Sequence, residues 1–198
     1  GGFKYFQGHT EWIKKQTKSK EVVMLLAAKN IKVALATTHI PLAEVPKKIQ
    51  KSKLIEIIKI LNSGLKSNFK IENPSIKVLG LNPHAGEDGK IGKEELLKIN
   101  PAVKICKEMG IKVSYARSAD TAFNNDQLIE TDAYLAMYHD QALPVLKALS
   151  FGKAVNITLG TPIVRTSVDH GTALEIAGKI KPNLGSIKEA INLAELQL

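Results

Sequence analysis

Short apolar runs alternate with longer amphipathic stretches along this chain. Apolar runs with few polar positions are typical of strands buried on both faces of a parallel sheet. The predicted strands, in chain order, are residues 32–37, 76–81, 112–116, 133–138, 155–159 and 163–168. Because predicted helices lie between most of them, the pattern predicts an α/β fold.

Helical periodicity fills most of the intervals between these strands. A long amphipathic stretch begins at Pro41, and its apolar positions follow helical spacing at Leu54, Ile57, Ile58 and Leu61. The other predicted helices are residues 22–28, residues 93–109, a segment after Gly171 and a last helix from Ser186. That last helix begins with Ser-Ile-Lys-Glu, the pattern of a capping box.

Histidines occupy segments of the kind that hold ligands. His9, His84 and His139 each end an apolar run, and His39, His84 and His139 each follow a predicted strand. Open α/β sheets bind ligands beyond the carboxyl ends of their strands. His39, His84 and His139 are therefore expected to lie together at this edge of the sheet, which we call the rim. Three imidazoles and an open position are typical of a catalytic metal site. An ordinary surface or hydrogen-bonded role is the alternative for each.

Several other polar residues are candidates for a ligand site. Asp120 and Asp140 could polarise a metal-bound hydroxyl or orient a ligand imidazole, although Asp120 could equally cap a helix or turn. A lysine, an amide and an arginine that converge would suit a phosphate-bearing substrate, and Lys147, Asn156 and Arg165 are such a set. Ordinary surface placement is the alternative for these three residues.

Familiar phosphate, dinucleotide and calcium motifs do not explain the chain. It contains no Gly-Lys-Ser/Thr and no Gly-x-Gly-x-x-Gly. Residues 84–95 have part of a calcium-loop spacing, but the first and third positions are His84 and Gly86, which lack side-chain oxygen ligands. We therefore do not expect a calcium site.

Composition limits the possible partners. The chain has 198 residues, 44% hydrophobic and 24% charged, as in a globular protein. Its net charge of +9 comes almost wholly from lysines interleaved with acidic residues, and only Arg117 and Arg165 are arginines, which disfavours nucleic-acid recognition. No apolar stretch is long enough to span a bilayer. The single cysteine, Cys106, favours a reducing compartment, and we expect a cytoplasmic protein.

Long motifs, in order over nearly the whole chain, resemble the 4-hydroxythreonine-4-phosphate dehydrogenase family of vitamin B6 synthesis. They include Gly-His-Thr-Glu, Ala-Thr-Thr-His-Ile-Pro-Leu, Leu-Asn-Pro-His-Ala-Gly-Glu and Ala-Met-Tyr-His-Asp-Gln. The likeness continues through residues 143–147, 155–160 and 165–173. So many long motifs in the same order make the resemblance specific.

The resemblance implies an oxidoreductase that depends on a metal and on NAD or NADP. It would oxidise and decarboxylate 4-phosphohydroxy-L-threonine to 3-amino-2-oxopropyl phosphate, in a homodimer with the active site at the interface. The implied fold is the three-layer α/β/α type of the isocitrate and isopropylmalate dehydrogenases, here a fragment lacking the family's N-terminal part. Residues 1–144 would form the central lobe with the metal ligands, and residues 145–198 would return to the second lobe.

The resemblance also implies roles for individual residues. His9, His84 and His139 would hold the metal, zinc first, with magnesium or cobalt as alternatives. Lys147, Asn156 and Arg165 would bind substrate, and Asp140, Asp120 and Lys147 are the candidates for acid–base catalysis. The cofactor side would be the segment Asp169, His170, Gly171 and Thr172.

Other functions remain open at this point. Close relatives of the family oxidise other four-carbon phosphorylated hydroxy acids, such as 4-phosphoerythronate or 4-phosphothreonate, with the same residues. A binding or dimerisation module without catalysis is a second alternative, and it would not bind NAD. A basic nucleic-acid binder is a third, and it would show salt-sensitive affinity for DNA.

Overall fold

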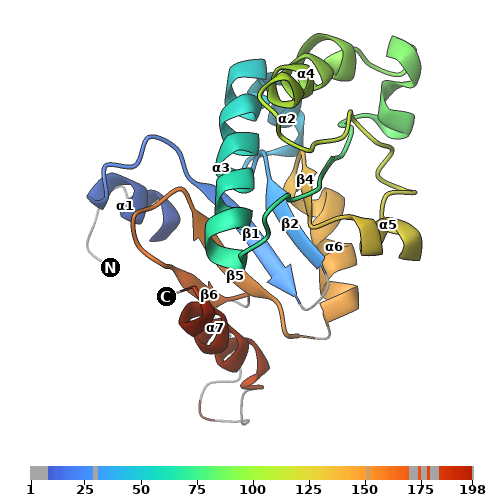
Figure 1. Ribbon diagram of the computed structural model, residues 1–198. Coiled ribbons are helices and arrows are strands. Elements are labelled where there is room, and N and C mark those ends of the chain that lie inside the picture. Colours follow the sequence, from blue (N-terminus) through green and yellow to red (C-terminus); the bar gives the residue numbers. More distant parts are fainter. Residues whose placement is uncertain are drawn as a thin grey trace.

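A computed structural model describes residues 9–28, 31–150, 152–169, 174, 178 and 183–197. Its centre is a six-stranded sheet with strand order β3-β4-β2-β1-β5-β6 (Figure 1). The strands are β1 (Val23–Ala28), β2 (Ile31–Leu35), β3 (Ile76–Val78), β4 (Ala133–Ala136), β5 (Val155–Leu159) and β6 (Thr166–Val168).

The sheet has a parallel half and an antiparallel half. β3, β4 and β2 are parallel neighbours, so their carboxyl ends reach the same edge. β1 runs antiparallel between β2 and β5, and β6 is antiparallel to β5. All residues of β3 and β4 are buried, as expected for parallel strands covered on both faces.

Helices cover both faces of the sheet, which confirms the three-layer α/β/α arrangement. On one face, α3 (Lys51–Phe69) and α4 (Asn100–Glu108) pack on alternate strand residues such as Leu135. On the other face, α6 (His139–Ser150) packs on the intervening residues, such as Tyr134. Figure 1 shows α3 across the front of the sheet and α6 on the other side. The remaining helical segments are α1 (His9–Gln16), η1 (Leu42–Glu44), α2 (Val45–Lys48), η2 (Pro83–Gly89), η3 (Glu95–Ile99), α5 (Asn125–Glu130) and α7 (Gly185–Leu196).

Two predicted elements were wrong. Residues 22–28 form strand β1 and not a helix, because this short apolar run pairs with β2 on one side and β5 on the other. Residues 112–116 were predicted as a strand, but this segment makes only isolated bridges, such as Val113 to Ile76. There the Ser114 hydroxyl, instead of a backbone carbonyl, accepts from the Val78 N–H at 3.2 Å.

The predicted capping box at Ser186 was also wrong. The N-cap position of α7 is Leu184, and it makes no side-chain cap hydrogen bond. The Ser186 hydroxyl instead donates to the Ala154 carbonyl at 2.8 Å and accepts from the Asp169 N–H at 3.1 Å. Ser186 therefore ties α7 to the segments that flank β5 and β6. The helix expected after Gly171 lies almost wholly outside the described residues.

The proposed division between residues 144 and 145 stays a prediction. β5 and β6, which follow that point, belong to the same sheet as β1 and β2. Among the described residues, no helix has the length and apolar character needed to cross a membrane.

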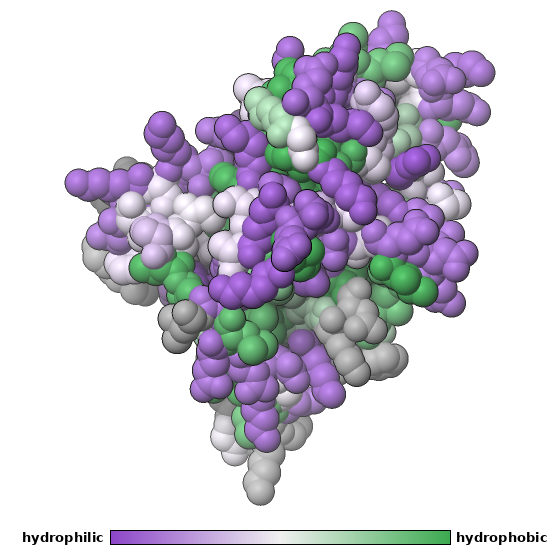
Figure 2. All heavy atoms as spheres, in the orientation of Figure 1, coloured by the Kyte–Doolittle hydropathy of each residue, from purple (hydrophilic) through white to green (hydrophobic). Residues whose placement is uncertain are grey.

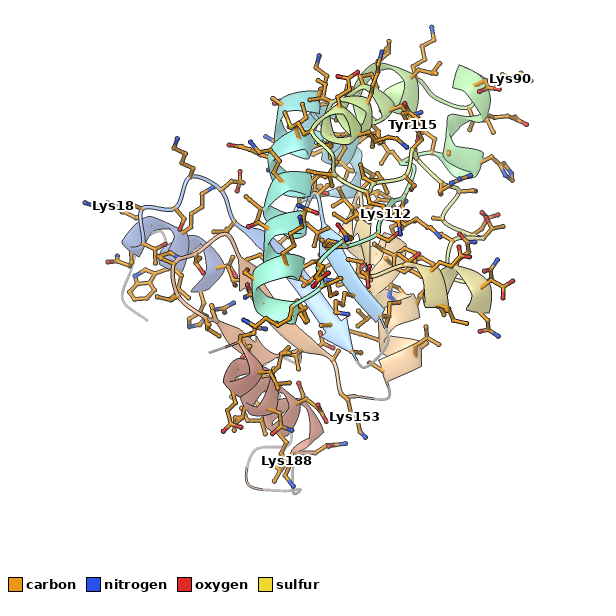
Figure 3. All side chains as sticks on the ribbon, viewed as in Figure 1. Lys18, Lys90, Lys112, Tyr115, Lys153 and Lys188 are labelled. Atoms are coloured by element: carbon orange, nitrogen blue, oxygen red, sulfur yellow. The ribbon has the colours of Figure 1, made fainter. Side chains whose placement is uncertain are left out.

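Hydrophilic side chains cover most of the face seen in Figure 2, with apolar patches between them. Lysines account for much of this character. Figure 3 shows Lys18 and Lys90 pointing outward from opposite sides of the fold, and Lys153 and Lys188 at its lower end. The lysines labelled in this view therefore do not form a single stripe.

Candidate active site

Three histidines lie where three adjacent parallel strands end. His39 follows β2, His84 follows β3, and His139 begins α6 directly after β4. The rings of His39 and His139 are 5.9 Å apart between centroids and are tilted by 46°. The predicted rim therefore exists, and its closest described pair is His39 with His139.

Two cavities flank this rim. One of about 380 Å³ is lined by His39 and His139, together with Thr38, Ile40, Pro41, Leu42, Val45, Tyr138 and Asp140. The other, of about 470 Å³, contains His84 and Asp120 and is lined by Tyr138 and Asp140 as well. Tyr138 and Asp140 therefore belong to both cavities, which places His39, His84, Asp120 and His139 around one contiguous region.

The His-Asp-Gln sequence at the start of α6 gives each side chain a contact. His139 Nδ1 lies 2.5 Å from Asp140 Oδ1, in a hydrogen bond that orients the imidazole. Gln141 Oε1 accepts from the Met137 N–H at 2.7 Å, and Gln141 Nε2 donates to the Gly80 carbonyl at 2.5 Å. Gln141 thus joins the end of β4 to the segment after β3, and so joins the supports of His139 and His84.

Asp120 is a rim residue whose side-chain pKa is lowered. The Ser118 hydroxyl donates to Asp120 Oδ1 at 2.5 Å, and this hydrogen bond is the main cause of the lowered pKa of Asp120. Desolvation opposes this effect and raises the pKa, while the Thr121 backbone N–H and the charge of His84 lower it further. Asp120 is therefore ionised at neutral pH and can accept a hydrogen bond or a proton.

The predicted phosphate-binding residues lie near the other half of the sheet. Asn156 and Thr158 alternate with Val155, Ile157 and Leu159, which belong to the core on the α3 side, so these two polar side chains lie on the α6 side. Arg165 Nη1 donates to Thr158 Oγ1 at 2.7 Å. Lys147, on α6, lies 3.5 Å from Asp169 Oδ2.

Asn156 is unusual among these residues. Its Oδ1 atom is buried and has no hydrogen-bond partner in the part of the chain that the structure describes. A buried acceptor left without a donor costs about 1–3 kcal/mol. An atom of this kind is explained when a ligand supplies the missing donor.

His9 is placed differently from the other predicted metal ligands. It is the first residue of α1, and its neighbour Thr10 lines a third cavity of about 310 Å³. That cavity shares Thr38 and Ile40 with the His39 cavity, but neither rim cavity is lined by His9. No one of these cavities is lined by His9, His84 and His139 together, so this predicted ligand set stays a prediction. His39, which was not in that set, lies at the rim beside His139.

The donor set suits a divalent transition metal, because imidazole and carboxylate groups gather at one rim. Within residues 9–28, 31–150, 152–169 and 183–197, however, no three histidine, cysteine or acidic side chains lie close enough to hold an ion. A complete metal site would therefore need a further ligand or a movement of the segment that carries His84.

On the predicted cofactor side, Asp169 pairs with Lys147, whereas His170, Gly171 and Thr172 lie outside the described residues.

Comparisons with known proteins agree with the fold and the motifs. Residues 1–194 match the family described as pyridoxal phosphate biosynthetic protein PdxA. The 4-hydroxythreonine-4-phosphate dehydrogenase of Pseudoalteromonas translucida is 53% identical over 194 residues, which cover 96% of this chain and 59% of that protein. The enzyme of that name from Chromobacterium violaceum is also 53% identical, over 190 residues that cover 96% of this chain and 58% of that protein.

Solved structures lead to the same family. The 4-hydroxythreonine-4-phosphate dehydrogenase of Klebsiella pneumoniae superposes with a TM-score of 0.86 at 38% identity, over 98% of this chain and 60% of that one. The enzyme from Burkholderia phymatum gives a TM-score of 0.85 at 43% identity, over 99% of this chain and 59% of that one. The chain thus spans a little under 60% of the length of the two curated relatives. On these matches in sequence and fold, the chain belongs to the PdxA family of pyridoxal phosphate biosynthetic proteins.

Proposed function

We propose that this sequence, at the length of its relatives, catalyses the oxidation and decarboxylation of 4-phosphohydroxy-L-threonine to 3-amino-2-oxopropyl phosphate. NAD, or NADP in its place, would accept the hydride. The observation that carries the proposal is the rim, where His39, His84, Asp120 and His139 surround one contiguous region. The names of the relatives supply the substrate.

Lys147, Asn156 and Arg165 are the proposed substrate-binding residues. Lys147 and Arg165 would neutralise the phosphate, and holding it fixes the reacting carbons against the rim. Lys147 is suited to this because its 3.5 Å separation from Asp169 is too long for a good hydrogen bond. The unpartnered Oδ1 of Asn156 would accept a hydrogen bond from a hydroxyl or ammonium group of the substrate.

For the metal, we propose His39, His84 and His139 as ligands in place of the set that included His9. The ring contact between His39 and His139 supports this choice, and His84 lines the adjoining cavity. Zinc, with magnesium or cobalt as alternatives, would supply Lewis acidity to the substrate hydroxyl. A second copy of the chain, in the proposed homodimer, could supply a ligand that this chain does not bring within reach.

Proton transfers fall to the acidic residues and Lys147. As hydride leaves the carbinol carbon, the hydroxyl proton would pass to a base, for which Asp120 and Asp140, which both line the cavity that contains His84, are the candidates. The resulting 3-oxo acid loses carbon dioxide when its carbon–carbon bond breaks. The electron pair left behind is protonated by an acid, for which Lys147 is a candidate. Asp169 and residues 170–172 are proposed to face the cofactor.

The test is NADH formation with 4-phosphohydroxy-L-threonine, in a form of this sequence extended to the length of its relatives. We expect turnover that His139→Ala abolishes and that the exposed-surface variant Lys153→Ala retains. Faster turnover of 4-phosphoerythronate or 4-phosphothreonate would replace the proposed substrate. Absence of turnover and of NAD binding would favour a module without catalysis.

A further inference from the structure

A left-handed turn carries His84. The five residues His84, Ala85, Gly86, Glu87 and Asp88 all have positive φ, with values of 51°, 51°, 80°, 43° and 54°. Only one of them is glycine, and for the others this conformation costs about 1–2 kcal/mol each. Surrounding structure must therefore hold the turn in place.

The Glu95 carboxylate lies beneath this turn. Glu95 begins η3 and is only 2% exposed. Its Oε1 accepts from the backbone N–H groups of Leu81 at 2.7 Å and Asn82 at 2.8 Å, and its Oε2 accepts from the side-chain amide of Asn82 at 2.9 Å. Hydrogen bonds to an ionised acceptor are roughly twice as strong as neutral ones. One buried carboxylate thus fixes the backbone that leads into the turn.

Three glycines make room for this arrangement. A Cβ on Gly86 would lie 2.6 Å from Glu95 Oε2, and a Cβ on Gly80 would lie 3.1 Å from Glu95 Oε1. A Cβ on Gly92 would overlap the side-chain amide of Asn82. The glycines of this segment therefore lie around the Glu95 carboxylate and its partner Asn82.

The same contacts reach His139. The Gly80 carbonyl, directly before the two N–H groups that Glu95 binds, accepts from Gln141, which also binds the Met137 N–H. A continuous hydrogen-bonded path therefore runs from Glu95, through the end of β3, to the residues before His139. Glu95 itself does not line either rim cavity.

We propose that Glu95 is the positioning residue of this site. It sets the direction of the His84 imidazole by holding the left-handed turn, without touching substrate, cofactor or metal. The part of this proposal that concerns metal affinity rests on the proposed function. The part that concerns the orientation of His84 does not.

The orientation is tested in this chain without metal, by comparing Glu95→Gln with Glu94→Gln. Glu94 is the matched control because it also binds the side-chain amide of Asn82, at 2.9 Å, but its backbone hydrogen bonds are with Lys93 and Glu94 itself, whereas the N–H groups of Leu81 and Asn82 bind Glu95. In Glu95→Gln a neutral oxygen replaces the carboxylate that accepts from two backbone N–H groups, and the new NH2 group opposes the Asn82 side-chain amide at the Oε2 position, so amide hydrogen exchange at residues 81–88 should accelerate by about 10- to 100-fold. The His84 ring signals in NMR spectra should shift, while both should stay unchanged in Glu94→Gln.

A second variant covers the case in which Glu95→Gln fails to fold. Gly86→Ala would bring a methyl group to 2.6 Å from Oε2 of the same carboxylate, so one of the two must shift. It should also shift the His84 ring signals and accelerate exchange in the turn. If neither folded variant changes the His84 signals or the exchange rates, Glu95 does not position His84.

Zinc titration separates positioning from general stability. Glu95→Gln should weaken Zn²⁺ binding by about 10- to 100-fold, as is usual for residues that orient a ligand. If Glu95 acts through His84, a chain with both Glu95→Gln and His84→Ala should bind zinc no more weakly than a chain with His84→Ala alone. Additive losses would overturn the proposal. If the unaltered chain binds no zinc, the metal assignment fails, and the exchange and ring signals still decide the role of Glu95.

Discussion

At the scale of single residues, Ser118 tunes Asp120. The Ser118 hydroxyl is the main cause of the lowered pKa of Asp120, so Ser118→Ala should raise that pKa toward its ordinary value. The lowered pKa means that the ionised Asp120 carboxylate stabilises the folded chain at pH values above the ordinary pKa of Asp. This stabilisation is lost as the pH falls from the ordinary pKa through the lowered one. In Ser118→Ala the two pKa values lie closer together, so the stabilisation is smaller and is lost over a narrower range of acidic pH. Carbon NMR of Asp120 against pH measures the change. Thr121→Ala is the control, because Thr121 acts through its backbone N–H.

The buried amide oxygen of Asn156 predicts a conflict between stability and binding. Asn156→Leu removes an unpartnered buried acceptor, so the free energy of unfolding should rise by about 1 kcal/mol in urea. The same variant should lose affinity for the phosphorylated substrate in the extended form. Thr158→Val, two residues along the same face, should instead destabilise the chain, because it removes the hydrogen bond with Arg165. A loss of stability in Asn156→Leu would contradict our reading of this residue.

Individual site residues were only partly predictable from the sequence. Positions after predicted strands correctly placed His39, His84 and His139 at one rim, because parallel strands share an edge. Sequence order could not show that α1 leaves His9 away from the rim cavities, since the path of a helix depends on tertiary packing. The role of Glu95 was not predicted either. The structure shows Glu95 as a buried acidic residue beside three glycines. The sequence shows the glycines and the acidic residue, but it does not show the burial.

At the scale of elements, the contact between α3 and β5 depends on Gly64. A Cβ on Gly64 would lie 2.7 Å from Leu159 Cδ1, in the fully packed core. Gly64→Ala should therefore lower the free energy of unfolding by about 1–3 kcal/mol, as overpacking does. Ser63→Ala, at the exposed neighbouring position, should not lower it. Urea midpoints of the two variants give the comparison, and a stabilised Gly64→Ala would contradict the packing argument.

The end of α3 offers a stabilising change. Lys70 is the C-cap residue and has a left-handed φ of 56°. Lys70→Gly should raise the free energy of unfolding by about 1 kcal/mol, because glycine adopts this conformation without steric cost. Lys66→Gly, inside the same helix, should lower it by about 1 kcal/mol. Thermal unfolding of both variants tests the prediction, and a shift of the same sign in both would disprove it.

Elements with strong patterns were predicted well. Residues 51–69 have clear helical periodicity, and residues 133–136 are buried on both faces, so both assignments were confirmed. Residues 22–28 failed because a short, wholly apolar run has no period that separates a buried strand from a helix. Residues 112–116 failed for a different reason, since a serine hydroxyl there takes the place of a backbone partner.

At the scale of the whole molecule, the net charge of +9 should not give DNA affinity. The labelled Lys18, Lys90 and Lys188 in Figure 3 extend from different sides of the fold. We expect no saturable binding of a short DNA duplex at about 0.15 M salt, near physiological ionic strength. Fluorescence anisotropy checks this. Binding that weakens steeply as salt increases would indicate a basic surface on another face of the molecule.

The overall architecture followed from the alternation of strands and helices, and the family from the order of its motifs. Strand order did not follow from either. β1 lies between β2 and β5 and runs antiparallel to both. Because residues 22–28 were predicted as a helix, the predicted sheet lacked this central strand.

The two hydrogen bonds of the Gln141 side chain limit how the lengths of the segments around this site can change. One amide spans the Gly80 carbonyl and the Met137 N–H, atoms that come from chain segments 57 residues apart in number. An amide has a fixed reach, so the two segments cannot change length independently without breaking the bridge. We therefore expect insertions to be tolerated in the outer connections but not between Val78 and Gly80 or between Met137 and Gln141. Library designs that alter substrate choice should keep both lengths constant and vary side chains only.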